Sequence, residues 1–87
     1  MISVGKISPS HFEVTVSGQT ITIHQVTLSD EYYQYLTSGA ITPESLIEKS
    51  FEFLLARESN TSILRTFDLP LINSYFPEYE EIIKSSS

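Results

Sequence analysis

The sequence predicts an α+β fold in which an N-terminal β-hairpin packs on a small helical bundle of three to five short helices. Apolar and polar residues alternate with the two-residue period of strands over residues 11–27. Two helix-capping patterns then open segments with helical spacing of apolar residues. At 87 residues, 40% hydrophobic and 18% charged, the chain suits one folded domain. We expect an irregular start over residues 1–10, the hairpin over 11–27, helices over 28–84 and a frayed tail over 85–87.

The hairpin prediction depends on a short turn between two alternating segments. A glycine-led, two-residue turn at residues 18–19 pairs Val16 with Ile21. This register places five apolar side chains on one face: Phe12, Val14, Val16, Ile21 and Ile23. The alternation changes phase after Ile23, so we expect a bulge or a strand end near His24.

Two helices follow the hairpin. Ser29 is expected to cap a short helix that ends near Gly39, where glycine favours a left-handed conformation. Thr42 and Pro43 form a stronger helix start, and this longer helix is expected to extend to about Glu58. Its apolar residues cover more than one stripe: Leu46, Ile47, Phe51, Phe53, Leu54 and Leu55. The long helix should therefore pack against two surfaces, and a second copy of the chain is a candidate for one of them.

Three short helices are expected in the last third of the chain, over residues 62–67, 69–75 and 78–83. Asn60 or Thr61 caps the first, Asp68 caps the second, and Pro77 opens the third. The predicted core residues are Phe12, Val14, Val16, Ile21, Ile23, Leu46, Ile47, Phe51, Leu54, Leu55, Ile63, Leu64, Phe67, Ile72 and Phe76. A core of this size is marginal, so dimerisation would help to stabilise it.

The composition excludes several kinds of function. Because the chain has no cysteine, it has no disulfide, thiolate zinc site or cysteine nucleophile. No apolar run approaches the ~20 residues of a membrane-spanning helix, and residues 1–6 lack the features of a signal peptide. We therefore expect a cytoplasmic protein with no membrane partner. Asn60-Thr61-Ser62 matches a glycosylation acceptor, but without a secretion signal we interpret it as a helix cap.

Candidate catalytic groups are few. In the predicted register His24 lies opposite Glu13, and an imidazole beside a carboxylate can serve as a general base or as part of a catalytic triad. We favour an ordinary solvent-facing cross-strand pair, because no serine lies in a nucleophile motif. A metal site built from His11, Glu13 and His24 lacks helical ligand spacing. We predict no catalytic, cofactor or metal site.

The chain is acidic, with eleven Asp and Glu against five Lys and Arg and a formal net charge of -6. Two groups of carboxylates are prominent: Glu44, Glu48 and Glu52, and Glu78, Glu80 and Glu81. We expect solvated helix faces, and the alternative is an acidic decoy that occupies a nucleic-acid-binding protein. The scattered cations form no patch for phosphate, so nucleic acid is not an expected partner.

Tyrosines are concentrated in two places. Tyr32, Tyr33 and Tyr35 cannot all face one core from neighbouring helical positions, so at least one is exposed or lies at an interface. Tyr75 and Tyr79 repeat the pattern near the C-terminus. The candidate interaction residues are Tyr32, Tyr33, Tyr35, Phe53, Tyr75 and Tyr79. The alternative is that tyrosines cover the rim of a small core with their hydroxyls in water.

Part of the chain resembles the ribbon-helix-helix fold. The segments VTLSDEYYQYL and ITPESLIEKSFEFLL, within residues 20–58, are similar to that family's strand, short helix and capped long helix. The resemblance implies an intertwined dimer that contacts DNA through the polar face of its strand. Here that face carries Thr22 and His24 without Arg or Lys, which argues against DNA binding. Ribbon-helix-helix-type transcriptional regulation is an alternative function.

A second resemblance covers most of the chain. The stretch SILRTFDLPLINSYFPEYEEII, with ITPESLIEKSFEFLLARES before it, resembles small bacterial proteins without an assigned activity. It implies a bacterial cytoplasmic protein and carries no site residues. The sequence has no recognisable nucleophile, metal-ligand set or phosphate loop, and its apolar and tyrosine surface is in surplus. We therefore predict a non-enzymatic interaction or regulatory module, antitoxin-like or an adaptor, that acts as a homodimer on a protein partner.

Overall fold

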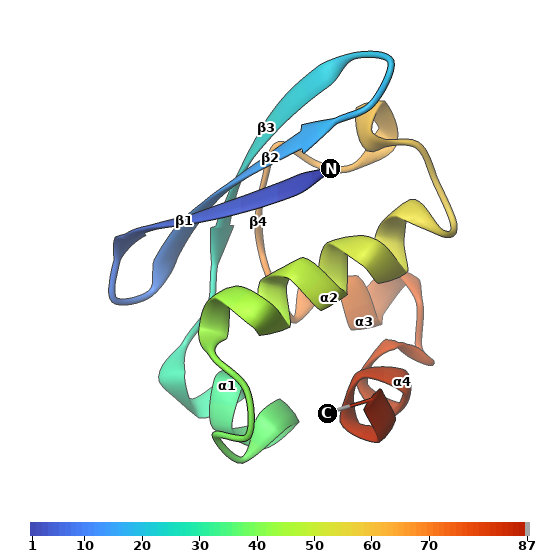
Figure 1. Ribbon diagram of the computed structural model, residues 1–87. Helices are drawn as coiled ribbons and strands as arrows, with labels where there is room; N and C mark the ends of the chain where they lie inside the picture. Colours follow the sequence, from blue (N-terminus) through green and yellow to red (C-terminus); the bar gives the residue numbers. More distant parts are fainter. Residues whose placement is uncertain (87) are drawn as a thin grey trace.

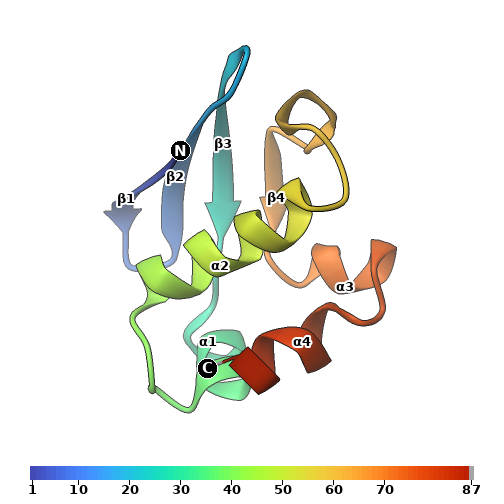
Figure 2. The same ribbon diagram turned by 45° about the vertical axis from the view of Figure 1, so that its right-hand side comes forward.

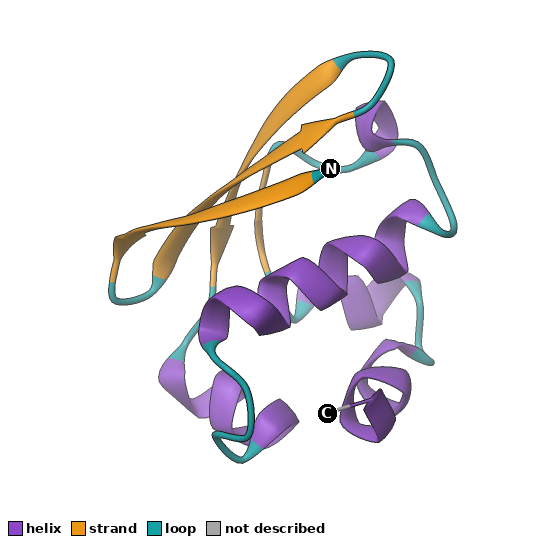
Figure 3. Cartoon of the chain, in the orientation of Figure 1, coloured by secondary structure: helices purple, strands orange, loops and turns teal. Residues whose placement is uncertain are grey.

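The computed structural model describes residues 1–86 and has an α+β architecture. Within these residues, one four-stranded mixed sheet is accompanied by four α-helices and a short 3-10 helix (Figures 1 and 3). The strands are β1 (Ile2–Ser8), β2 (His11–Ser17), β3 (Ile21–Thr27) and β4 (Thr66–Asp68). The helices are α1 (Asp30–Thr37), α2 (Pro43–Leu55), η1 (Asn60–Ser62, the 3-10 helix), α3 (Leu71–Tyr75) and α4 (Tyr79–Ser86).

The sheet combines three N-terminal strands with one strand from the last third of the chain. Its strands lie in the order β1-β2-β3-β4, with β1, β2 and β3 antiparallel and β4 parallel to β3. Figures 1 and 2 show α2 lying across one side of the sheet, with α1 and α4 farther from the strands. Buried side chains of β2 and α2, such as Val14 and Ile47, therefore lie at the centre of the core.

The first strand is a feature that the sequence analysis missed, because residues 1–10 were expected to be irregular. Ile2 and Val4 lie opposite Val16 and Val14 in the β1–β2 pairing. Both side chains are only partly buried, since β1 lies at the edge of the sheet. In such an edge strand apolar and polar residues alternate only weakly, so the sequence pattern does not predict a strand. The hydrogen-bonded pairing with β2 stabilises the extended conformation of residues 2–8.

The hairpin prediction is confirmed, but its register is wrong by one residue. The loop comprises residues 18–20, and β2 and β3 pair Val16 with Thr22 and Val14 with His24. A one-residue change in register moves every side chain of a strand to the other face. Ile21 and Ile23 are therefore 66% and 49% exposed, whereas His24 is 0% exposed.

The expected change of phase near His24 does not occur. The β2–β3 pairing is continuous from Ser17–Ile21 to His11–Thr27, without a bulge. Three consecutive inward positions of β3 are Thr22, His24 and Val26, and all three are buried. Two of these three inward side chains of β3 are polar, and their burial is possible because both make hydrogen bonds.

The two predicted helix starts are confirmed by their caps. The Ser29 hydroxyl accepts a hydrogen bond from the Tyr32 amide, and the Thr42 hydroxyl accepts one from the Ser45 amide. Pro43 is the first residue of α2, as expected. The first helix ends at a left-handed Ser38 (φ 52°), followed by Gly39 (φ 79°). The second helix ends at Leu55, before the expected Glu58.

The long helix α2 packs against two surfaces, and both belong to the same chain. On the sheet side, the Phe51 ring lies 5.3 Å from the His24 ring and 6.1 Å from the Phe67 ring. On the other side, the Phe53 ring lies 5.2 Å from the Tyr79 ring. The C-terminal helix α4 thus covers the apolar surface for which a second copy of the chain was a candidate.

The last third of the chain differs most from the prediction. Residues 62–67, expected to be helical, contain the end of η1 and the start of β4. Asp68 does not cap a helix, since its carboxylate accepts a hydrogen bond from the Thr27 hydroxyl. A three-residue strand has no measurable period, and its structure comes from the parallel pairing of Phe67 with Val26. The last helix includes Ser85 and Ser86, expected to fray, while Ser87 lies outside the described residues.

The core also differs from the predicted set. Three predicted members are exposed, namely Ile21, Ile23 and Leu64. Two others, Leu55 and Phe76, are only partly buried. The buried apolar residues that were missed are Val26, Leu28, Leu36, Phe53, Leu69, Tyr79 and Ile83. The errors at Ile21, Ile23 and Val26 follow from the wrong hairpin register, and those at Leu64 and Leu69 follow from the unexpected return of the chain to the sheet at β4.

A buried hydroxyl pair joins α2 to α4 and leads to a stability prediction. The Ser50 hydroxyl donates to the Leu46 carbonyl at 2.8 Å, and the Tyr79 hydroxyl lies 2.6 Å from Ser50 Oγ. Ser50 and Tyr79 are both fully buried, and burial raises the pKa of the Tyr79 phenol. With the Ser50 proton engaged by the carbonyl, the phenol is the donor within the pair.

Ser50→Ala is expected to lower the free energy of unfolding by about 1–3 kcal/mol, because it leaves the buried Tyr79 hydroxyl without its partner. Tyr79→Phe is expected to cost about 0.5–1.5 kcal/mol, because Ser50 keeps its bond to the Leu46 carbonyl. The double variant should lose less than the sum of the two single losses. Urea unfolding of the four proteins measures all three values; additive losses would show that the pair is not coupled.

Candidate functional site

An apolar groove of about 470 Å³ lies beside the β4 edge of the sheet. It lies between the C-terminal end of α2, the segment that leads into β4, and α3. Its lining residues are Leu54, Glu58, Ser62, Ile63, Leu64, Phe67, Leu71, Ile72, Tyr75 and Phe76. The volume falls in the range of sites that take small ligands or side chains of a partner, about 300–1,000 Å³.

Three local features build the groove. Phe67 of β4 points to the core side of the sheet and forms part of the floor. Pro70 then starts α3 almost directly after the strand, because proline is tolerated in a first helical turn. Leu71 and Tyr75 lie one turn apart on α3 and therefore share a face. The short β4–α3 connection thus places this face of α3 beside β4, where it lines one side of the groove.

The groove has a buried floor and an exposed rim. Leu54, Ile63 and Ile72 are buried and supply the floor together with Phe67. At the rim, Leu64 is 47% exposed and Tyr75 is 65% exposed. Exposed aliphatic and tyrosine side chains over an apolar floor are typical of surfaces that bind an apolar group.

A chain of buried and partly buried hydrogen bonds, which we call the polar clamp, holds the rim segment on the sheet. It consists of Asn60, Thr22, His24 and the Leu64 carbonyl. The Asn60 amide donates to Thr22 Oγ1 at 3.0 Å, and the Thr22 hydroxyl donates to His24 Nε2 at 2.9 Å. His24 Nδ1 donates to the Leu64 carbonyl at 2.7 Å. Since a carbonyl can only accept, the clamp requires the neutral ring to carry its proton on Nδ1.

The environment of His24 favours its neutral form. Burial lowers the pKa of the His24 imidazole, the bond to the Leu64 carbonyl partly opposes this effect, and the charge of Arg65 lowers the pKa further.

The Asn60 amide, which the glycosylation motif would modify, also donates to the Thr20 carbonyl at 2.8 Å. Asn60 therefore anchors η1 on the β2–β3 loop instead of capping a helix.

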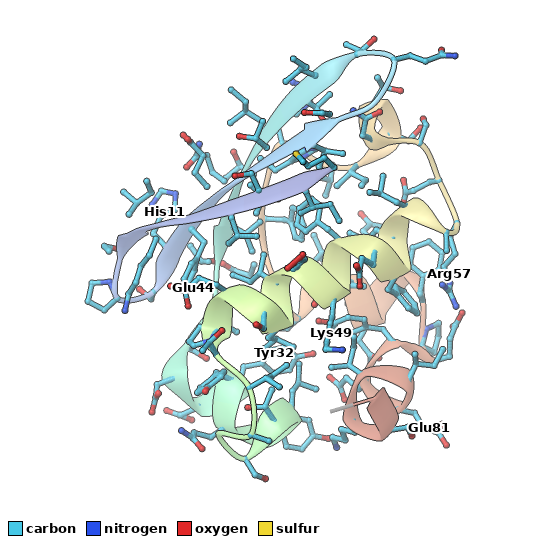
Figure 4. All side chains as sticks on the ribbon, in the orientation of Figure 1. His11, Tyr32, Glu44, Lys49, Arg57 and Glu81 are labelled. Carbon is cyan, nitrogen blue, oxygen red and sulfur yellow. The ribbon has the colours of Figure 1, made fainter. Side chains whose placement is uncertain are left out.

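The predicted pair of His24 and Glu13 does not form, because the two side chains lie on opposite faces of the sheet. Glu13 instead accepts a hydrogen bond from Gln25 Nε2 at 3.1 Å. His11 Nε2 donates to Gln25 Oε1 at 2.6 Å. Figure 4 shows His11 near one end of the sheet. The Gln25 side-chain amide thus lies between the partly buried His11 imidazole and the Glu13 carboxylate.

Among the candidate interaction residues, the tyrosines of α1 mostly serve contacts within the fold. The Tyr32 hydroxyl donates to Glu80 at 2.8 Å, and burial together with this bond raises the pKa of the Tyr32 phenol. Tyr35 donates to the same carboxylate at 3.4 Å, and the Lys84 ammonium lies 3.7 Å from the centre of the Tyr35 ring. Figure 4 shows Tyr32 between α1 and α4. These contacts hold α1 against α4.

The other candidate interaction residues fall into two groups. Tyr33 donates to the Ile41 carbonyl, which braces the turn between α1 and α2. Phe53 and Tyr79 are buried between α2 and α4, so their side chains are part of the core and not of a surface. Tyr75 is exposed and lines the groove. Sequence analysis missed the other groove residues as a site, since they come together only when β4 joins the sheet.

Comparisons with known proteins add no family to this description. The chain matches no protein-family model, no curated protein and no solved structure at a significant level. In the described part of the chain, no three His, Asp or Glu side chains lie close enough to hold a metal ion. Over the same residues, every helix is too short or too polar to cross a membrane.

Proposed function

We propose that the chain is a non-enzymatic protein-interaction module and that the groove binds an apolar segment of a partner protein. The observation that carries the proposal is the exposure of Leu64 and Tyr75 above a buried apolar floor. A side chain that enters the groove would cover both and exclude water from them, which is the main source of affinity at protein interfaces.

The alternatives gain less support from the same structure. An intertwined ribbon-helix-helix dimer pairs one strand of each copy, whereas β3 already has β2 and β4 on its two sides. A nucleic-acid decoy needs free carboxylates on one face, whereas Glu78 lies 3.5 Å from Arg57 and Glu80 accepts from Tyr32. The net charge of -6 also disfavours direct contact with phosphates.

Leu64→Glu is expected to abolish partner binding, because it places a charge at the groove rim. Ile23→Glu is the matched control: Ile23 is an aliphatic residue of nearly equal exposure on the opposite face of the sheet. The measurement is a tagged pull-down from host lysate, with and without nuclease, read by mass spectrometry. We expect the wild type and Ile23→Glu to retain one stoichiometric, nuclease-resistant protein that Leu64→Glu loses at least tenfold.

Other outcomes would redirect the proposal. If both variants retain the partner equally well, the groove is not part of the interface. Retention that disappears on nuclease treatment would favour nucleic-acid binding. Recovery of the chain alone would point to self-association, for which β1, as one of the two edge strands of the sheet, could pair with a second copy. Circular dichroism of each variant confirms that it is folded before its binding is compared.

A further inference from the structure

The groove contains one carboxylate whose charge nothing in the described chain neutralises. Of the lining residues, Glu58 alone is charged at neutral pH, and its carboxylate makes no hydrogen bond or ion pair with any described residue. Its side chain is partly buried at the end of α2. A carboxylate beside an apolar floor is less well hydrated than one on an open surface, so a cation there gains more from pairing with it.

The neighbouring cation is committed to other contacts. Arg57 lies 3.5 Å from the Glu78 carboxylate and donates to the Phe53 carbonyl at 3.0 Å. Its guanidinium also lies 3.6 Å from the centre of the Phe53 ring. Figure 4 shows Arg57 beyond the end of α2. The negative charge of Glu58 is therefore available to a ligand.

We propose that the groove selects a partner segment in which a bulky apolar side chain is accompanied by a lysine or arginine. This inference rests on the proposed function and specifies the chemistry of the bound segment. The apolar side chain lies on the floor beside Phe67 and Ile72, and the cation pairs with Glu58. The net charge of -6 attracts such a segment from a distance and raises its association rate.

Three small probes that share a phenyl ring test the two parts of the recognition separately. They are 2-phenylethylammonium, 2-phenylethanol and 3-phenylpropanoate, each titrated into the ¹⁵N-labelled 87-residue chain at neutral pH and low salt. Amide shifts of groove residues such as Leu64 and Tyr75 report binding. We expect the ammonium to bind about three- to tenfold more tightly than the alcohol, and the carboxylate to bind most weakly.

Glu58→Gln is the variant that tests the assignment, and Glu44→Gln is its matched control. Both glutamates are partly exposed, and both changes remove one negative charge, but Glu44 lies in the first turn of α2 (Figure 4). In Glu58→Gln the ammonium and the alcohol should bind equally well. In Glu44→Gln the preference for the ammonium should remain.

The outcomes separate this inference from the function on which it rests. Equal binding of all three probes by the wild type would overturn the selection of a cation and leave the groove as an apolar binding surface. An ammonium preference that persists in Glu58→Gln would assign the attraction to overall charge and overturn the role of Glu58. If no probe shifts the groove amides, the groove does not bind apolar groups, and the proposed function is wrong as well.

Discussion

Phe51→Ala is expected to lower the free energy of unfolding by about 3–5 kcal/mol. The Phe51 side chain is fully buried at the middle of α2 and contacts the rings of His24 on β3 and Phe67 on β4. Its removal leaves a cavity where the helix meets the two strands nearest the groove. A domain of this size is stabilised by about 0.05–0.15 kcal/mol per residue, so the loss is a large share of the total.

Chemical denaturation by urea measures this loss, with two comparisons. Phe51→Leu keeps most of the volume and is expected to lose clearly less than the alanine variant. Glu52→Ala changes the next residue of α2, which is exposed, and should remain within about 0.5 kcal/mol of the wild type. A loss below about 1.5 kcal/mol for Phe51→Ala would contradict the central place of this ring in the core.

His24→Ala is the second large loss, expected at about 2–4 kcal/mol near pH 7.5. The change empties a buried site against Phe51, and it also deprives the Leu64 carbonyl of its donor and the Thr22 hydroxyl of its acceptor. His11→Ala is the control, because His11 is only partly buried and makes one side-chain hydrogen bond. Equal losses for the two variants would contradict the polar clamp.

The same residue makes stability depend on pH. Burial lowers the pKa of His24 in the folded chain below its usual value near 6.5. Below that value the unfolded chain binds a proton that the folded chain does not, so the free energy of unfolding falls as the pH falls. Above about pH 7.5 the ring is neutral in both states and the full contribution is present. A protonated ring would lose the acceptor that Nε2 offers to the Thr22 hydroxyl.

Urea unfolding at pH 7.5 and pH 5.5 tests this dependence. The wild type is expected to lose more stability over this interval than His24→Gln, whose amide can both donate and accept but does not titrate. An NMR titration of the wild-type His24 ring gives the midpoint directly, even if the glutamine variant folds poorly. A midpoint at or above 6.5, or equal losses in the two proteins, would contradict the prediction.

Only part of the candidate site is visible in the sequence. Tyr75 was identified as an interaction residue from the clustering of tyrosines near the C-terminus, and it lines the groove. Leu54 and Glu58 were assigned to the long helix, and the lining residues from 62 to 72 were assigned to two short helices, since the segment around Phe67 has no period of its own. The groove exists because Phe67 pairs with Val26 across a long stretch of chain, and no local pattern encodes that pairing.

Local chemistry alone specifies the helix starts and the existence of the hairpin. A Ser29 or Thr42 hydroxyl bonds an amide three residues away, and such contacts form with little help from the rest of the chain. The hairpin register, the strands β1 and β4 and the burial of His24 are decided by the tertiary structure. In each case the deciding energy comes from partners distant in sequence: the Thr22 and His24 side chains face inward because Asn60 and the Leu64 carbonyl satisfy them there.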